Sequence, residues 1–427
     1  MTIFERIQAI LTFRNGTIVN LDESSIISAS IKRQCCSDGK FEIGGVYAAS
    51  LSMKCRVSGT NSFRIRGAKL VVSTKFDGVE EDFQPVGTFW ITDAPRTGEI
   101  YSITAVDNVG WLDTNNYTDS QANALENFID YFRSRHRGNA TMYTWFHYLT
   151  SDMNSIISRM TGLSNFLEWK DYDTVKNGRF CNQYYTDDSH PDGVELEYYI
   201  EISGHSGSPD VPREIYKRFA EITGGFIYAC EDGRLTLGQF GQKEFGTAEI
   251  SASEIELDSF EPADFKVVIA QVGAGSKIAQ GDAVGTEASP NPDDVFYYFT
   301  VDNNIFLDGF AQLYINGAGG YSVVHFNTLK PIASGIFNYL YWFHDFEIRP
   351  FRCKVHKPER FHLGQKIKIP DGTQEFESVI TSIQWTFRGG TVLACGGEDS
   401  RTLSGCSRYS KADKALMRCA ALENKSS

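Results

Sequence analysis

The first quarter of the chain is a succession of short segments in which apolar and polar residues alternate, separated by glycine-containing turns. Alternation with a period of two puts the apolar side chains on one face of a β-strand. The dipeptides Asn15-Gly16, Asp77-Gly78 and Thr97-Gly98 are typical of tight turns between such strands. From Ile10 to Asp113 the pattern predicts a β-barrel or sandwich of about a hundred residues. The expected strands are 10–13, 17–19, 25–31, 46–57, 68–76, 87–92 and 100–106.

After Asn115 the pattern changes to that of an insert with helices. Asp119 can cap a helix over 124–132, and residues 151–160 have a second apolar face at helical spacing. Residues 170–205 are polar with weak periodicity, which predicts loops with one or two short strands. A third helix is expected over 212–223, because Pro212 stands at its first position and Gly224-Gly225 can end it. A hairpin over 226–237 follows.

A second β-rich region begins near Leu257. Between its strands, residues 321–340 are expected to hold a helix, and the long loop 280–294 is expected to be mobile or to form an interface. A short amphipathic helix is expected over 411–422. The expected strands are 266–272, 295–301, 345–349, 351–355, 365–369 and 379–387.

The fold class that follows is α+β, mainly β, with two β regions flanking a mixed α/β insert. The predicted boundaries are 1–115 for the first β domain, 116–250 for the insert, 251–400 for the second β domain and 401–427 for a C-terminal tail. Two β regions around an insert also suggest an ancient duplication, although no period of 20 to 50 residues repeats locally.

Composition excludes several classes of protein. With 427 residues, 41% of them hydrophobic, the chain is too long for one small domain and too apolar for intrinsic disorder. A net charge of −13 without a basic cluster disfavours tight nucleic-acid binding. We expect no signal peptide and no transmembrane segment, because no apolar stretch reaches about 18 residues. Nine cysteines without a C-x-x-C pair predict free thiols in a reducing cytosol.

Candidate chemistry is weak throughout the chain. Gly273-Ala-Gly275 follows an apolar strand but lacks the third glycine of a dinucleotide-binding turn. The eight histidines form no zinc-binding pair, and Cys395, Cys406 and Cys419 have no ligand spacing. No G-x-S-x-G or P-loop occurs. We therefore expect no enzyme, no catalytic, cofactor-binding or metal-binding residues, and no cofactor.

One enzyme-like alternative remains open. Pairs of carboxylates beside aromatic residues could act on, or bind, glycans of a cell surface. The pairs are Asp171 with Asp173, Asp187 with Asp188 and Asp293 with Asp294, and the aromatic residues are Trp169, Tyr172, Tyr184 and Tyr185. An intracellular scaffold is a third class of function.

The order of segments resembles the baseplate hub and tail-tip (tail-associated) proteins of bacteriophages, prophages and phage-tail-like particles. The similarity covers about residues 10 to 397 and is spread over six pieces in the family's order. These are 13–19, 42–53, the paired runs 85–94 and 101–113, then 214–237, 301–307, and finally 363–364 with 380–391. Residues 170–205 do not align.

The resemblance implies two tube-like β-barrel domains around an inserted domain. It also implies a homotrimer that forms a pseudo-hexameric ring and joins the tail tube to the tip or spike. The implied partners are tail tube and distal tail proteins, a tip, spike or lysin protein, and the tape-measure protein, while DNA passes through without specific binding. The implied location is the virion tail tip, after synthesis in the bacterial host cytoplasm. Because the chain stops at Ser427, we expect a bare hub that leaves lytic and receptor-binding work to other chains.

A hub of this kind predicts a distribution of charge. We expect the side chains that line the bore to be acidic or neutral, so that DNA does not adhere, with Lys and Arg on outer faces or at subunit contacts. The strands 50–57 and 266–272 are candidates for the wall. Solubility alone would equally explain a negative surface.

Overall fold

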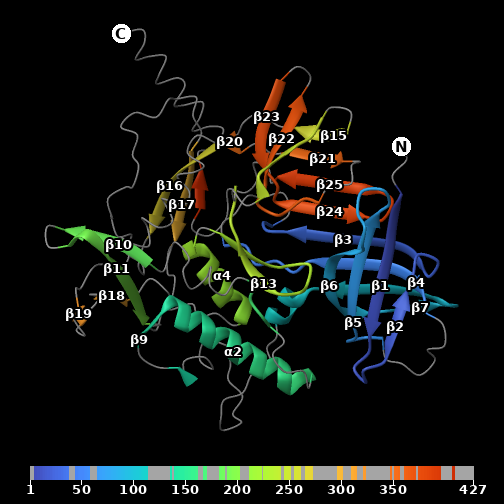
Figure 1. Cartoon of the computed structure of the whole chain (residues 1–427), viewed down its shortest axis with the longest axis horizontal. Coiled ribbons are helices and arrows are strands. Elements are labelled where there is room, and N and C mark those ends of the chain that lie inside the picture. Colours follow the sequence, from blue (N-terminus) through green and yellow to red (C-terminus); the bar gives the residue numbers. More distant parts are fainter. Residues whose placement is uncertain are drawn as a thin grey trace.

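The protein is mainly β, and its largest element is a 12-stranded sheet (Figure 1). The computed structural model describes residues 4–37, 44–57, 65–113, 135–136, 139–161, 167–170, 182–187, 190–201, 211–223, 225–241, 245–251, 254–260, 265–272, 296–301, 309–314, 321–323, 347–348, 351–355, 360–371, 374–395 and 406–408. The strands of the large sheet are β1 (Glu5–Thr12), β2 (Ile18–Leu21), β3 (Ile26–Gln34), β4 (Ser50–Arg56), β5 (Lys69–Phe76), β6 (Gln84–Asp93), β7 (Arg96–Thr97), β8 (Ile100–Val106), β15 (Ile255–Phe260), β21 (Phe351–Val355), β24 (Ser382–Thr386) and β25 (Gly390–Cys395).

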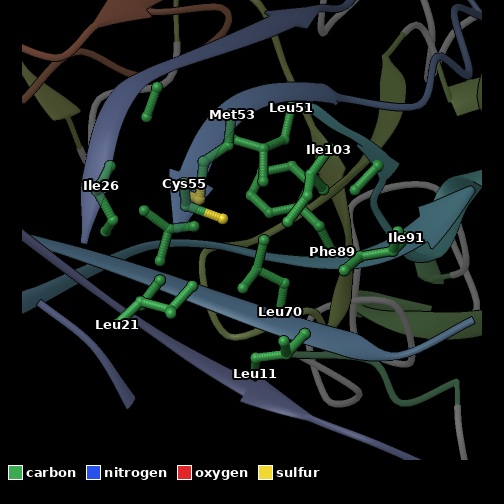
Figure 2. Close-up of a cluster of buried hydrophobic side chains, with 14 of the residues drawn as sticks. Leu11, Leu21, Ile26, Leu51, Met53, Cys55, Leu70, Phe89, Ile91 and Ile103 are labelled. Atoms are coloured by element: carbon green, nitrogen blue, oxygen red, sulfur yellow. The ribbon is translucent and has the colours of Figure 1, made fainter. Parts of the chain in front are cut away.

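Period-two alternation produces the first core. In β4, Leu51, Met53 and Cys55 are buried, whereas the serines, lysine and arginine between them are exposed. The buried side chains of β3, β4 and β8 point toward those of β1 and β5, and the two walls enclose one apolar cluster (Figure 2). Each fully buried aliphatic side chain contributes about 1.5–3 kcal/mol to folding. The cluster therefore gives the first β region its own stable core.

The two β regions share the large sheet. Its order is β15-β21-β25-β24-β3-β4-β8-β6-β5-β1-β2, with β7 on β8. The seam is the antiparallel pair β24 and β3, in which Ser382 lies opposite Gln34 and Trp385 opposite Ile31. Figure 1 shows the orange and red strands of the second region continuing directly into the blue strands of the first. Among the described strands, the sheet ends at β15 and β2, and no pairing closes it into a barrel.

Smaller elements surround this sheet. A 3-10 helix, η1 (Asn108–Asp113), follows β8, and two helices, α2 (Met142–Thr161) and α4 (Pro212–Thr223), belong to the insert. The hairpin of β12 (Phe226–Ala229) and β13 (Leu235–Gly238) follows α4. A three-stranded sheet consists of β14 (Thr247–Glu249), β22 (Lys366–Asp371) and β23 (Gln374–Val379). A five-stranded sheet contains β9 (Asn139–Thr141), β10 (Asn182–Asp187), β11 (His190–Glu201), β18 (Gly309–Tyr314) and β19 (Tyr321–Val323). A four-stranded sheet contains β16 (Phe265–Val272), β17 (Phe296–Val301), β20 (Glu347–Ile348) and β26 (Cys406–Arg408).

Most local expectations are confirmed. The strands of the first β region, the helix from Pro212 and the hairpin after it all form. Residues 170–205 contain two strands, β10 and β11, as expected, but β11 has 12 residues and is not short. The expected helix 151–160 is the second half of the longer α2. The expected helices 124–132 and 411–422 and the loop 280–294 lie outside the described residues.

Three expectations need correction. Residues 379–387 are two strands, because Ile380 bonds with the backbone of Gly364 and Gln365 while Thr381 bonds with Ala394, so the chain crosses between sheets there. The start of the expected helix 321–340 is instead β19, which pairs with β18. Residues 46–49 precede β4, because Val46 pairs with Ile227 of the hairpin. The two β regions also share one open sheet, which the sequence did not predict.

Six cysteines, at positions 35, 36, 55, 230, 353 and 395, are buried and form no disulfide, as the prediction of free thiols requires. In the described part of the chain, no helix has the length and apolar character needed to cross a membrane.

Candidate functional site: the junction of the two β regions

The junction between β24 and β3 is held by the N-terminal strand. Trp385 Nε1 donates a hydrogen bond of 2.7 Å to Glu5 Oε1, and the backbone N–H of Arg388 donates one of 2.7 Å to Glu5 Oε2. Arg388 also forms an ion pair with Glu23. Burial raises the pKa of Glu5, although the two hydrogen bonds lower it. One carboxylate of the first β region thus satisfies two donors of the second.

The turn after β24 presents these donors. Arg388 has a φ of 60°, in the left-handed region that non-glycine residues rarely adopt, and Gly390 has a φ of 81°. The backbone N–H of Phe387 bonds to the carbonyl of Ala29 in β3, which fixes the start of this turn on the first region. The strained turn is therefore positioned by the junction itself.

A second bond between the regions involves Arg360, which precedes β22. Arg360 Nε and Nη2 lie 3.0 and 2.8 Å from Glu80 Oε1, while Glu80 Oε2 accepts the backbone N–H of Phe76 at 3.0 Å. Both side chains are half-buried, so this pair is less exposed to screening than an ion pair in open solvent.

A cavity of about 300 Å³ lies where the two β regions meet. Its volume is at the lower end of the usual range for ligand sites, which is about 300–1,000 Å³. Its charged side chains already have protein partners, because Arg360 bonds Glu80 and Arg33 bonds Glu231. The cavity is lined by Ile31, Arg33, Thr74, Phe76, Gln84, Pro85, Val86, Glu231, Arg360, Phe361, His362, Ile383, Trp385 and Thr391.

The hairpin of the insert docks beside this junction through its turn. Arg33 Nη1 lies 3.1 Å from Glu231 Oε1, and Thr88 Oγ1 donates to the Glu231 carbonyl at 3.2 Å. Asn108 Nδ2 donates to the carbonyl of Gly233 at 2.5 Å. Gly233 has a φ of +91°, and a Cβ there would lie 3.2 Å from both Asn108 and Thr88. Glycine is required at this turn for its conformation and for the close approach.

Asp107 and Asn108 connect the docking site to the first core. Asn108 Oδ1 accepts the indole N–H of Trp90 at 2.8 Å, so its amide bridges β6 and the hairpin. Asp107 is buried and accepts the backbone N–H groups of Ala49 and Val109, each at 3.0 Å. Desolvation by burial nevertheless raises the pKa of Asp107 to about 7. Both residues hold backbone segments together.

The weak chemical candidates do not assemble into a site. His136 stacks on Tyr148 and bonds to Asp152, whereas His362 stacks on Phe245. Within the described ranges, no group of three His, Cys, Asp or Glu side chains could hold a metal ion. Cys395 is buried at the end of β25 and Cys406 begins β26, whereas Cys419 lies outside the described residues, as does Gly273-Ala-Gly275.

The aromatic candidates for glycan binding are described only in part. Trp169 is 8% exposed, stacks on Tyr216 with ring centroids 6.3 Å apart, and donates to Thr150. It is a packing residue and offers no open face to a sugar. Tyr184, Tyr185 and Asp187 belong to β10. Tyr172 and Asp188, and the pairs Asp171 with Asp173 and Asp293 with Asp294, lie outside the described residues.

Sequence reasoning missed the residues that make the junction. Two of the runs that carry the family resemblance, 101–113 and 214–237, contain Asp107, Asn108 and Gly233. The resemblance therefore pointed to these segments but did not indicate that the three residues hold the junction. Glu5 and Trp385 gave no signal, because their partnership depends on strands that are far apart in sequence.

Comparison with known proteins finds similarity only at the level of structure. No protein-family model matches the chain, and no curated protein is similar to it in sequence. A tail protein from Neisseria meningitidis MC58 is 10% identical, with a TM-score of 0.46 over 92% of this chain and 97% of that one.

Two prophage proteins are similar over the same extent. The 43 kDa tail protein of prophage MuSo2 from Shewanella oneidensis is 12% identical, with a TM-score of 0.42 over 91% of this chain and 96% of that one. The prophage tail protein gp18 from Listeria monocytogenes EGD-e is 9% identical, with a TM-score of 0.43 over 97% and 99%. All three are tail proteins, which is the class that the sequence resembles.

Proposed function

We propose that this protein is a structural, non-catalytic hub of a phage tail or phage-tail-like particle, and that it forms a trimeric pseudo-hexameric ring joining the tail tube to the tip or spike. The observation that carries the proposal is the β24–β3 seam, which makes one continuous sheet out of two β regions. A chain that contributes two joined β units needs only three copies to give six units around an axis.

In this proposal, residues 1–115 and 251–400 are the two tube-like domains, residues 116–250 are the insert and residues 401–427 are a tail. The partners are tail tube and distal tail proteins, a tip, spike or lysin protein, and the tape-measure protein. The site of action is the virion tail tip, and DNA passes without sequence-specific binding.

The ends of the large sheet support ring formation. Each end strand, β2 or β15, has one neighbour among the described strands, and edge strands offer backbone groups for pairing with another chain. Because the two ends of the sheet are different strands, they suit a head-to-tail contact, which is the kind of contact that can close into a ring.

Exposed apolar side chains gather at the β2 end. Ile10 and Ile18 lie on the same face of the β1–β2 pair, opposite Asn20 and Thr12 respectively, and are 40% and 61% exposed. An apolar patch beside a sheet edge is what a subunit contact would bury.

The test is the oligomeric state of the full chain by multi-angle light scattering and negative-stain microscopy. We expect a ring of three copies for the natural protein and monomers for the double variant Ile10→Lys with Ile18→Lys. The matched control is Val79→Lys, which changes a residue that is 55% exposed in a turn and should leave the trimer intact. Only dimers or tetramers of the natural protein would contradict the proposal.

A further inference from the structure

Within the described strands, one face of the large sheet carries basic side chains and no acidic ones. It consists of the outward residues of β21, β25, β24, β3, β4 and β8, on the side away from the core cluster. Five are basic, ten are Ser, Thr or Gln, and five are apolar. The basic residues are Lys32, Lys54, Arg56, Arg352 and Lys354. The others are Ile27, Ser28, Ser30, Gln34, Ser50, Ser52, Ile100, Ser102, Thr104, Val106, Ser382, Gln384, Thr386, Val392 and Ala394.

This bias runs against the composition of the chain, which has 54 acidic residues and 41 basic ones. Acidic residues enter the register at the neighbouring strand on each side: Asp93 of β6 is opposite Thr104, and Glu256 of β15 is opposite Lys354. The same side of the sheet carries a lysine again one strand beyond β6, because Lys69 of β5 lies opposite Trp90 and Trp90 lies opposite Val106. Across the six strands themselves, no acidic residue interrupts the basic face.

Strand register sets the spacing of these charges. Lys354, Val392, Gln384 and Lys32 follow one another in a cross-strand row, and the row continues to Ser50. Neighbouring strands are about 4.8 Å apart, so β21 and β4 are separated by about 19 Å. Positive charge is spread along the sheet and does not converge on one point, which suits an extended polyanion better than a small anion.

We propose that this face contacts the phosphate backbone of double-stranded DNA without reading its sequence. Lys and Arg neutralise phosphates, and the many Ser and Thr hydroxyls can donate to phosphate oxygens. The face offers few apolar anchors for a protein partner, because interfaces with proteins depend on buried aromatic and aliphatic groups. The choice of DNA as the polyanion rests on the proposed function, in which DNA passes the hub.

The net charge of −13 does not prevent such a contact. Salt limits the reach of a charge to about 8–10 Å at physiological ionic strength, so DNA on this face responds mainly to the charges beneath it. The outward residues of β4, a strand expected to be acidic or neutral if it lines the bore, are Ser50, Ser52, Lys54 and Arg56. If this face lines the bore, the passing DNA is held weakly by it and is not repelled.

The test is fluorescence anisotropy of a labelled duplex with the full-length protein at about 50 and 200 mM salt. We expect equal affinity for two duplexes of unrelated sequence. Lys54→Ser with Arg56→Ser should weaken binding at low salt about tenfold or more, and should reduce the slope of log affinity against log salt by about 2. The matched control, Lys170→Ser with Lys217→Ser, removes the same charge from the insert, away from the large sheet, and should bind as the natural protein does.

A footprint needs no substitution and covers the case of a variant that fails to fold. Bound duplex should protect Lys32, Lys54 and Lys354 from acetylation, while Lys170 and Lys217 of the insert react as in the free protein. The inference is overturned if protection is absent, if both variant pairs lose equal affinity, or if polyglutamate displaces the duplex at equal charge concentration. If the protein forms a ring but binds no duplex, this inference is wrong and the proposed function stands. If the protein is a monomer that binds duplex through this face, the proposed function is wrong and this inference stands.

Discussion

Trp385 donates its indole N–H to the Glu5 carboxylate at 2.7 Å across 380 residues of sequence. The same carboxylate accepts the backbone N–H of Arg388, so the N-terminal strand fastens the turn that follows β24. The seam between the two β regions is thus held by side chains as well as by strand pairing.

Loss of this hydrogen bond should weaken the seam. Trp385→Phe keeps an aromatic ring and removes the donor, so we expect the free energy of unfolding to fall by about 1–3 kcal/mol in urea titrations. Glu5→Gln should cost a similar amount. If the two changes are coupled through the bond, the double variant should lose less than their sum, and additivity within about 0.5 kcal/mol would argue against the coupling.

Asp107 should make stability depend on pH. Its folded pKa of about 7 lies above the ordinary 3.8, so the folded state binds a proton more tightly than the unfolded chain does. Its contribution to stability is therefore fully present below about pH 4 and is lost as the pH rises through 7. The difference in unfolding free energy between the natural protein and Asp107→Asn should shrink by a few kcal/mol over that range.

Asp22 provides the control of opposite sign. Hydrogen bonds from Ser24, then Ser25, lower the pKa of this exposed carboxyl, so its contribution is present above the ordinary pKa and is lost as the pH falls through the folded pKa. The unfolding free energy of Asp22→Asn should therefore differ from that of the natural protein mainly at pH values above that acid range. A flat pH profile for the Asp107→Asn difference would show that Asp107 ionises normally.

Asn108→Ala should detach the hairpin turn from the first core. The change removes the acceptor of the Trp90 indole N–H and the donor to the Gly233 carbonyl. We expect the free energy of unfolding to fall by about 1–3 kcal/mol for each of these groups that stays buried. Thermal unfolding should report the loss. Asn20→Ala, on the exposed face of β2, is the control and should stay within about 0.5 kcal/mol of the natural protein.

Gly45→Ala should be more damaging than Gly16→Ala. A Cβ at Gly45 would lie 1.9 Å from the Cys35 carbonyl oxygen, so backbone segments must separate, and we expect a loss of about 3 kcal/mol or more. At Gly16 the φ is +83° but no atom lies within 4 Å, so only the strain of about 1–2 kcal/mol applies. Equal losses in chemical denaturation would refute this ranking.

The buried thiols should react slowly in the native protein. Burial raises the pKa of Cys55 to about 11 and of Cys230 and Cys395 to about 12, so almost no thiolate is present at pH 8. Alkylation followed by peptide mass spectrometry should leave these three unmodified until denaturant is added. Rapid native labelling of any of them would contradict the buried placement.

Local pattern predicted the elements of the first β region because alternation and turn residues are encoded within a few positions. Pro212 and the Asp232-Gly233 turn likewise predicted α4 and the hairpin from the sequence alone. Family resemblance added the two-region plan. The local features share one property, which is that each depends on neighbouring residues.

The junction could not be predicted in the same way. Pairing of Trp385 with Ile31 depends on which strand edge is left free after the first core forms, and no short-range signal records it. The break at Ile380 and Thr381 is similarly invisible, because both residues suit a strand and only tertiary hydrogen bonds divide it. Periodicity described the faces of β3 and β4, but only the register revealed that their basic residues continue onto β21.

The seam also sets an order of events during synthesis. Gln34 leaves the ribosome 348 residues before its partner Ser382, which at 5–20 residues per second is about 20 to 70 s. The first core contains only residues up to 105, so it can form early. The edge of β3 then stays unpaired until β24 has been synthesised. Lys32 and Arg33 on that edge are the kind of residue that discourages adhesion between nascent chains. Translation speed, chaperone capture and premature termination should therefore affect the yield of this protein mainly through one strand edge.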